Sequence, residues 1–219
     1  MKYIPIVENA NYLFKEKHSL SVRIWHWTTF LVIAASLVTV LFASTVFATR
    51  DNISMVQEQV QSKGGIVSPI QARAVAHEYS DKLWMLHKYI GYGLCFLVLS
   101  RIVIEVAHSN EEKLTNKVKK ALFLRAGKSM RSDANHYLFV KLGYVFFYFI
   151  FITMAITGLG LAYEDVPFLK SIHKPLIQVH GFVQYLIYAF ILVHIAGVVR
   201  ADVTDKKGIV SGMINGSNT

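Results

Sequence analysis

The sequence predicts an all-α integral membrane protein, a bundle of four membrane-spanning helices. Hydrophobic residues make up 53% of the chain and charged residues only 17%, whereas a soluble domain carries about 25% charge. Four long apolar runs follow one another along the 219 residues, each long enough for a helix to cross a bilayer. The one cysteine, Cys95, excludes an intrachain disulfide scaffold. We therefore expect a single membrane domain over residues 1–219.

The four predicted spans are rich in Leu, Ile, Val and Phe. They cover about residues 24–48, 83–106, 137–163 and 175–199. Backbone groups in lipid must be satisfied within the segment, so runs of this length predict helices rather than isolated strands. The first run is longer than the roughly 7–15 residues of a signal-peptide core, and we expect it to be retained.

The segments between the spans predict connections with little apolar content. In the long first loop, Ser68 followed by Pro69 is typical of a helix start, and we expect a helix from Pro69 to about Asp81 that leads into the second span. The charged loop 108–135 is expected to lie at the lipid headgroups. Aromatic residues at the span ends are expected to be interfacial anchors: Trp25, Trp27, Trp84 and Tyr163.

The distribution of Lys and Arg predicts the orientation of the chain in the membrane. Fourteen of these residues lie in the two terminal tails and the loop between spans two and three, against six in the other two loops. Loops rich in Lys and Arg stay on the cytoplasmic side, so both termini are expected there. The same bias accounts for the net charge of +9, which we attribute to membrane orientation rather than to nucleic-acid binding.

Histidines inside the apolar runs are the candidate functional residues. Ionisable side chains within a span are costly and mark functional sites. Four of the nine histidines lie there: His26, His87, His180 and His194. In the expected orientation, His26 and His194 lie near the cytoplasmic face, and His87 and His180 near the external face. His180 and His194 are 14 positions apart, which places them within roughly 40° on one helix face and about 21 Å apart.

This spacing favours two bulky cofactors at two depths. It is too large for a binuclear metal centre, in which the metals lie roughly 3.5–4 Å apart. Imidazole is a ligand of haem iron, and helix bundles hold cofactors between facing helices. Two histidines for each iron close both axial positions, which favours electron transfer over binding of oxygen. Two alternatives remain open: four isolated core histidines, and a path for zinc or another metal.

The surroundings of the histidines fit non-covalent haem. The chain has no Cys-x-x-Cys-His, which excludes covalent c-type attachment and indicates b-type haem. Gly91, Gly181 and Gly197 each lie within one helical turn of a candidate histidine. They leave room either for a macrocycle or simply for close helix packing.

Several stretches of sequence carry a family resemblance. The first span begins with Arg23-Ile-Trp-His-Trp27, and the fourth keeps two histidines, with Phe190 four residues before the second. Ile156-Thr-Gly158 in the third span and the tail from Arg200 to Gly216 extend the pattern. Together these stretches resemble the b-type cytochrome subunit of membrane-bound NiFe hydrogenases, within the bacterial di-haem cytochrome b561-like group.

The resemblance implies two haems, their ligands and a place in the cell. It implies that His26 with His194 ligates one haem b, and His87 with His180 the other. It also implies electron traffic in the bacterial inner membrane between a periplasmic, hydrogenase-like redox partner and the quinone pool. Candidate contacts to haem propionates or a quinone headgroup are Arg23, Arg101, Arg200 and, one turn from Arg101, Glu105. Their alternative roles are positive-inside anchoring and a structural Arg–Glu pair.

Three functions therefore compete at this point. We expect an electron-transfer subunit of an oxidoreductase complex rather than an enzyme in its own right. The alternative is a stand-alone cytochrome b561-type oxidoreductase acting on quinol, superoxide or ferric iron, which would need a surface site beside one haem. The second alternative is a non-redox membrane scaffold or transporter.

Overall fold

The computed structural model describes residues 18–107, 113–126, 131–204 and 208–216, and every element within them is helical. Four long helices are apolar enough to cross a membrane. They are α2 (Leu20–Ser44), α4 (Pro69–Ala107), α6 (Arg131–Ala162) and α8 (His173–Val203). The expected all-α membrane fold is confirmed. The first helix ends at Ser44, four residues before the expected end of the span.

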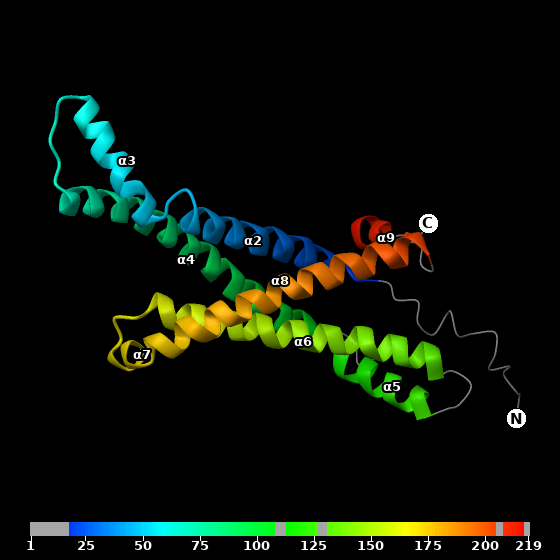
Figure 1. The fold of residues 1–219 in the computed structure, drawn as a ribbon. Coiled ribbons are helices and arrows are strands. Elements are labelled where there is room, and N and C mark those ends of the chain that lie inside the picture. The colour runs from blue at the N-terminus through cyan, green and yellow to red at the C-terminus, as the bar shows by residue number, and fades with distance from the viewer. Residues whose placement is uncertain (1–17, 108–112, 127–130, 205–207, 217–219) are drawn as a thin grey trace, which may run out of the picture.

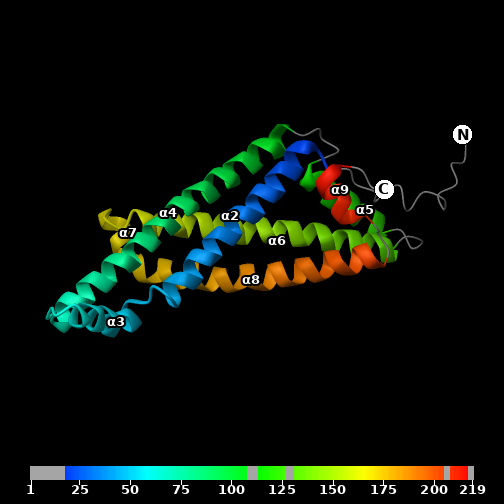
Figure 2. The same cartoon turned by 90° about the horizontal axis from the view of Figure 1, so that it is seen from above.

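The four long helices form two crossed pairs (Figures 1 and 2). Helix α2 packs along α4, α6 packs along α8, and the two pairs meet where α4 crosses α6. Neither α2 nor α4 packs extensively on α8 in the described part of the chain. The first pair therefore meets α8 through side chains rather than through close approach of the backbones.

Within the described ranges, four shorter helices mark the two ends of the bundle. Helices α3 (Thr49–Ser62) and α7 (Pro167–Ser171) lie at one end, called here the α7 end. At the other, the α9 end, lie α9 (Ile209–Asn215) and α5 (Leu114–Ala126), which packs on α6. Helix α5 occupies the charged loop for which we expected a position at the headgroups, and residues 108–112 and 127–130 of that loop lie outside the described residues.

The α7 end carries a helical hairpin built from α3 and the first half of α4. Ser68 begins α4 with a capping box, because its backbone N–H donates to Gln71 Oε1 at 2.9 Å and its Oγ accepts the Gln71 N–H at 3.3 Å. A stripe of small buried side chains, Ala72, Ala76 and Ser80, faces inward along α4, which packs against α3 here. The expected helix start at Pro69 is confirmed, and the helix runs unbroken into the second span.

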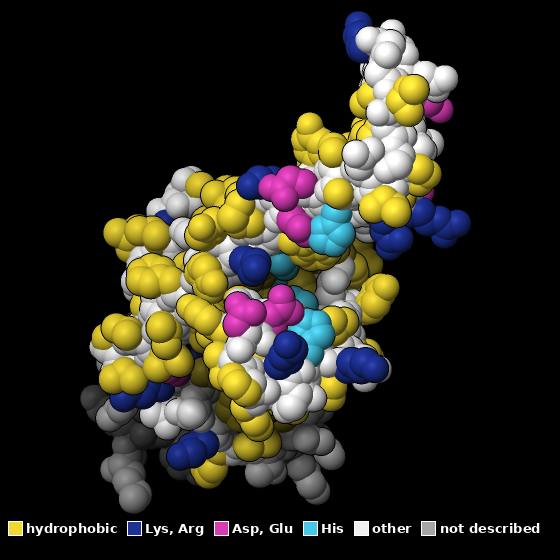
Figure 3. All heavy atoms as spheres, turned by 90° about the vertical axis from the view of Figure 1, so that its left-hand side faces the viewer, with side chains coloured by type: hydrophobic (Ala, Val, Ile, Leu, Met, Phe, Trp, Pro, Cys, Tyr) yellow, Lys and Arg dark blue, Asp and Glu magenta, His cyan; other side chains and the backbone are white. Residues whose placement is uncertain are grey.

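The surfaces of the four long helices are mostly apolar and exposed, as lipid contact requires. Figure 3 faces the α7 end and shows charged and histidine side chains gathered in its middle, with hydrophobic side chains around them. Side-chain contacts between histidine and carboxylate at this end include His77–Asp81 at 2.8 Å and His173–Glu164 at 3.3 Å. A polar cap on an apolar bundle is the arrangement expected of a membrane helix bundle.

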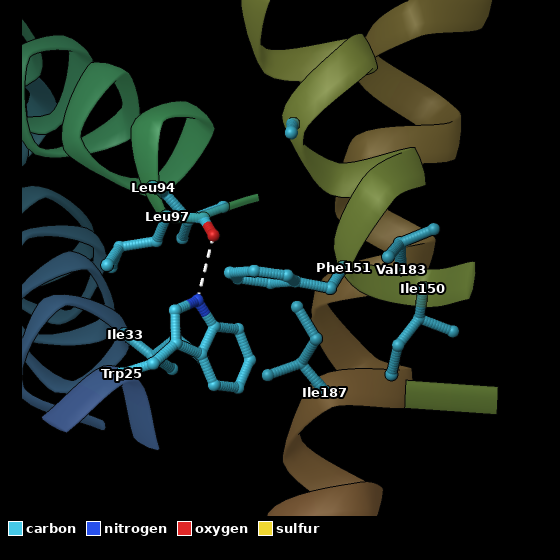
Figure 4. Packing of buried hydrophobic residues seen from close by; sticks show 9 residues of the cluster. Trp25, Ile33, Leu94, Leu97, Ile150, Phe151, Val183 and Ile187 are labelled. Carbon is cyan, nitrogen blue, oxygen red and sulfur yellow. Dashed lines mark hydrogen bonds between the residues drawn. The ribbon is translucent and has the colours of Figure 1, made fainter. Parts of the chain in front are cut away.

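A small aromatic core holds the two helix pairs together (Figure 4). Trp25 is buried, its Nε1–H donates to the Leu97 carbonyl at 2.8 Å, and its ring meets Phe151 edge-on at 6.2 Å. Ile33, Val183 and Ile187 complete the contact between helices. The expectation that Trp25 is an interfacial anchor was wrong, because its ring faces the neighbouring helices; Trp27, Trp84 and Tyr163 are exposed.

Candidate functional site

The structure brings the four intramembrane histidines together as two separate pairs. At the α9 end, the ring centroids of His26 on α2 and His194 on α8 are 6.1 Å apart, with the rings tilted by 58°. Towards the α7 end, the rings of His87 on α4 and His180 on α8 are 6.4 Å apart and nearly perpendicular. Helix α8 therefore contributes one histidine to each pair, and its partner comes from a different helix each time.

Both ring separations match two imidazoles that share one iron. A histidine nitrogen lies about 2 Å from a bound metal ion. If two such rings held one iron between them, their centroids would lie about 6 Å apart, because each centroid lies about 1 Å behind its nitrogen. No hydrogen bond joins the two rings of either pair among the described residues, so the spacing is not that of a direct imidazole–imidazole contact.

The space around the pairs suits a flat macrocycle. Both pairs bridge α8 to helices that do not pack extensively on it. At Gly91, Gly181 and Gly197, an added Cβ would meet no atom within 4 Å. Thr29, one turn along α2 from His26, is buried, and its hydroxyl has no hydrogen-bond partner among the described residues. The residues present therefore fit two haems held between α8 and the first helix pair.

The pair near the α7 end is held by two threonines that sequence reasoning did not assign. His87 Nδ1 lies 2.8 Å from Thr39 Oγ1, and His180 Nδ1 lies 2.9 Å from Thr157 Oγ1. Both threonines are buried. Their signal in the sequence is a hydroxyl inside an otherwise apolar span, but many membrane helices carry such a residue bonded only to its own backbone.

A glycine fits closely against the same pair. A Cβ at Gly158 would lie 3.3 Å from Cε1 and 3.8 Å from Nδ1 of His180. The missing side chain therefore allows the imidazole to approach α6 and reach Thr157 on that helix.

Aromatic rings surround the pair at the α9 end. The His194 ring is stacked parallel to Phe190, with centroids 5.8 Å apart and planes 8° apart. His26 meets the edge of Trp27 at 5.5 Å. Phe190 in turn contacts Phe147 at 4.8 Å, which continues the aromatic packing towards the core.

Arg101 and Glu105 lie in a polar network at the α9 end of α4. Arg101 Nε donates to the Tyr148 hydroxyl at 2.8 Å, and Nη2 pairs with Glu105 Oε2 at 2.9 Å. The other carboxylate oxygen accepts the Leu114 N–H at the start of α5, at 2.6 Å. Arg101 Nη1 is buried and has no hydrogen-bond partner among the described residues. The network thus joins three helices and leaves one donor open.

Arg23 and Arg200 lie apart from that network. Arg23 Nη1 donates to the Ile214 carbonyl at the end of α9, at 2.9 Å. Trp27 Nε1 donates to the neighbouring Met213 carbonyl at 3.2 Å. The side chains of α2 thereby satisfy two carbonyls that the last turn of a helix leaves unpaired. Arg200 is exposed near the end of α8. The structure brings Arg101 and Glu105 together and does not gather the three arginines into one cluster.

Comparison with known proteins identifies the family. The family model described as prokaryotic cytochrome b561 matches residues 17–216. No significant similarity connects the chain to a curated protein or to a solved structure. The match covers all four long helices and all four intramembrane histidines. The chain therefore belongs to the prokaryotic cytochrome b561 family, and it is a multi-pass bacterial membrane cytochrome that binds b-type haem and transfers electrons across the membrane.

Proposed function

We propose that the chain binds two b-type haems, one ligated by His26 and His194 and the other by His87 and His180. The observation that carries this proposal is the pair of ring separations, 6.1 and 6.4 Å, at two depths of one bundle. A haem iron with two histidine ligands supplies one-electron redox chemistry. The residues of the chain would hold each haem between the helices, supply two histidine ligands to its iron and exclude water with apolar side chains.

Haem content tests this proposal directly. A pyridine-haemochrome assay on the purified protein is expected to give two b-type haems per chain. His180→Ala is expected to lose only the haem near the α7 end, and His194→Ala only the haem at the α9 end. His77→Ala is the matched control, since His77 is exposed and pairs with Asp81. Folded protein without haem, or either ligand variant that retains both haems, contradicts the assignment.

We propose that both termini are cytoplasmic, so that the α9 end faces the cytoplasm and the α7 end the periplasm. The excess of Lys and Arg in the terminal tails and the loop between α4 and α6 supports this orientation. Single cysteines introduced at Ser62 and Ser211, in a Cys95→Ser background, test it with a membrane-impermeant thiol reagent on intact cells. Labelling is expected at position 62 only, and labelling at position 211 only would reverse the orientation.

We further propose that a quinone exchanges electrons near the α9 end and a periplasmic, hydrogenase-like redox protein docks at the α7 end. A quinone that is being reduced needs charge stabilisation and a proton source. Arg101 Nη1 has no hydrogen-bond partner within the described residues and belongs to the guanidinium that pairs with Glu105, which supports a quinone oxygen at this place. Each electron would then cross most of the bilayer between the two histidine pairs of α8.

Quinone-linked turnover in Arg101→Gln and Glu105→Gln tests the quinone site. Both variants are expected to lower turnover while both haems stay in place, as checked by haem content. Lys88→Gln serves as a charge-removing control on the same helix, because Lys88 is exposed and lies away from the network. Unchanged turnover in both variants would move the quinone site to another part of the membrane surface. Co-purification of a periplasmic dehydrogenase tests the partner.

A further inference from the structure

The two histidine pairs differ in what holds their rings. In the pair formed by His87 and His180, each Nδ1 meets a threonine hydroxyl, at 2.8 and 2.9 Å. In the pair formed by His26 and His194, the rings meet aromatic side chains, and no hydrogen bond to a ring nitrogen is described for the residues the structure covers. The difference lies in Thr39 and Thr157, which are not themselves among the proposed haem ligands.

The hydrogen bonds of Thr39 determine which nitrogen of His87 carries the proton. Thr39 Oγ1 lies 2.6 Å from the carbonyl oxygen of Ser36 as well as 2.8 Å from His87 Nδ1. A carbonyl only accepts, so the single hydroxyl proton goes to Ser36. The contact with His87 is then a hydrogen bond only if Nδ1 carries a proton and donates it to Oγ1. A neutral imidazole with its proton on Nδ1 has a free lone pair on Nε2.

Thr157 repeats the arrangement on α6. Its hydroxyl lies 2.8 Å from the Thr153 carbonyl and 2.9 Å from His180 Nδ1. By the same reasoning the hydroxyl proton goes to the backbone, and His180 donates its Nδ1–H to Thr157. Two threonines on two different helices therefore act in the same way on His87 and His180. In both histidines the proton lies on Nδ1 and the lone pair of Nε2 is free.

We propose that Thr39 and Thr157 are positioning residues for the haem near the α7 end: their hydroxyls accept the Nδ1–H of His87 and His180, aim Nε2 at the iron and favour its ferric state. The proposal rests on the proposed ligation of a haem by this pair. A hydrogen bond from the outer nitrogen makes a metal-bound imidazole a stronger electron donor. A stronger donor stabilises ferric over ferrous iron and so lowers the reduction potential of that haem.

The expected change in reduction potential can be worked out from the usual effect of residues that hydrogen-bond to a metal ligand. Removing a residue that orients a metal ligand typically changes metal affinity about 10–100-fold. If the affinity for the ferric form alone falls tenfold, the reduction potential of a one-electron couple rises by about 59 mV. Within the described residues, no hydroxyl bonds to His26 or His194, so the potential of the haem that they are proposed to ligate is expected to stay the same.

The experiment compares isosteric and conservative variants of the full-length protein in detergent. Thr39→Val and Thr157→Val remove the hydroxyl and keep the shape, while Thr39→Ser and Thr157→Ser restore a hydroxyl. Thr153→Val is the matched control. Thr153 lies one turn from Thr157 on the same helix, and its hydroxyl donates to the Phe149 carbonyl rather than to a histidine. The readouts are a redox titration of each haem and the low-spin ferric signals in electron paramagnetic resonance, with the signal that His180→Ala removes assigned to this haem.

Each valine variant is expected to raise the potential of this haem alone and to shift its ferric signal, while the serine variants and Thr153→Val match the parent. Loss of this haem alone in a valine variant, with retention in the matching serine variant, also supports positioning. Two haems with unchanged potentials and signals in both valine variants overturn the inference and leave the haem ligation standing. Absence of haem from the parent protein refutes the proposed function itself.

Discussion

Adding one methyl group at Gly158 should weaken the binding of the haem near the α7 end and leave the binding of the other haem unchanged. In Gly158→Ala, the new Cβ would lie 3.3 Å from His180 Cε1. Carbon atoms in good contact are about 3.5–4.0 Å apart, so the imidazole must retreat by about 0.4 Å. Its Nδ1 now lies 2.9 Å from Thr157 Oγ1, and a retreat along this line stretches the contact to about 3.3 Å, beyond the usual range for N–H···O bonds.

The magnitude follows from the loss of that hydrogen bond. A net contribution of about 0.5–1.5 kcal/mol is typical, and 1.4 kcal/mol corresponds to a factor of about ten in affinity. We therefore expect Gly158→Ala to bind the haem near the α7 end up to about tenfold more weakly. The assay is haem titration into apoprotein, followed by the absorption of each haem.

Gly143→Ala is the matched control for this experiment. Gly143 lies on the same helix, and a Cβ there would meet no atom within 4 Å, so both haems should bind as in the parent. Unchanged affinity of Gly158→Ala for both haems, or weaker binding of the haem at the α9 end instead, would contradict this prediction.

Three further predictions concern the frame around the haem sites. Trp25→Ala should lower the free energy of unfolding by about 3–5 kcal/mol, because it empties the aromatic core; thermal unfolding measures this, and a change below about 1 kcal/mol would contradict it. Gly216→Ala should loosen α9, since Gly216 has a φ of 78° and the Arg23 guanidinium fills the place of its Cβ; faster proteolysis of the C-terminal tail, with an intact bundle, is the expected readout. Ser68→Ala should cost about 1 kcal/mol at the start of α4 by removing its side of the capping box with Gln71; faster hydrogen exchange confined to that hairpin checks it, and unchanged protection there would count against it.

The sequence alone determined the fold class and the depth of the candidate ligands. Span length and apolar content are local properties, so four helices followed from composition, and the positions of the four histidines along them followed from counting residues. The hairpin helix α3 was not predicted, because its residues Thr49–Ser62 are mostly polar and carry no apolar run. The pairing of the four histidines as haem ligands remains a prediction, although their rings lie at the expected separations.

Only the tertiary structure decided what surrounds those histidines. Thr39 meets His87 across 48 positions of sequence, and Trp25 meets Leu97 across 72. A hydroxyl or an indole in an apolar span is compatible with bonding to its own backbone, with facing lipid or with a neighbouring helix. Which of these occurs depends on how the two helix pairs cross. That crossing is set by side-chain packing between residues far apart in the chain, and no local pattern in the sequence records it.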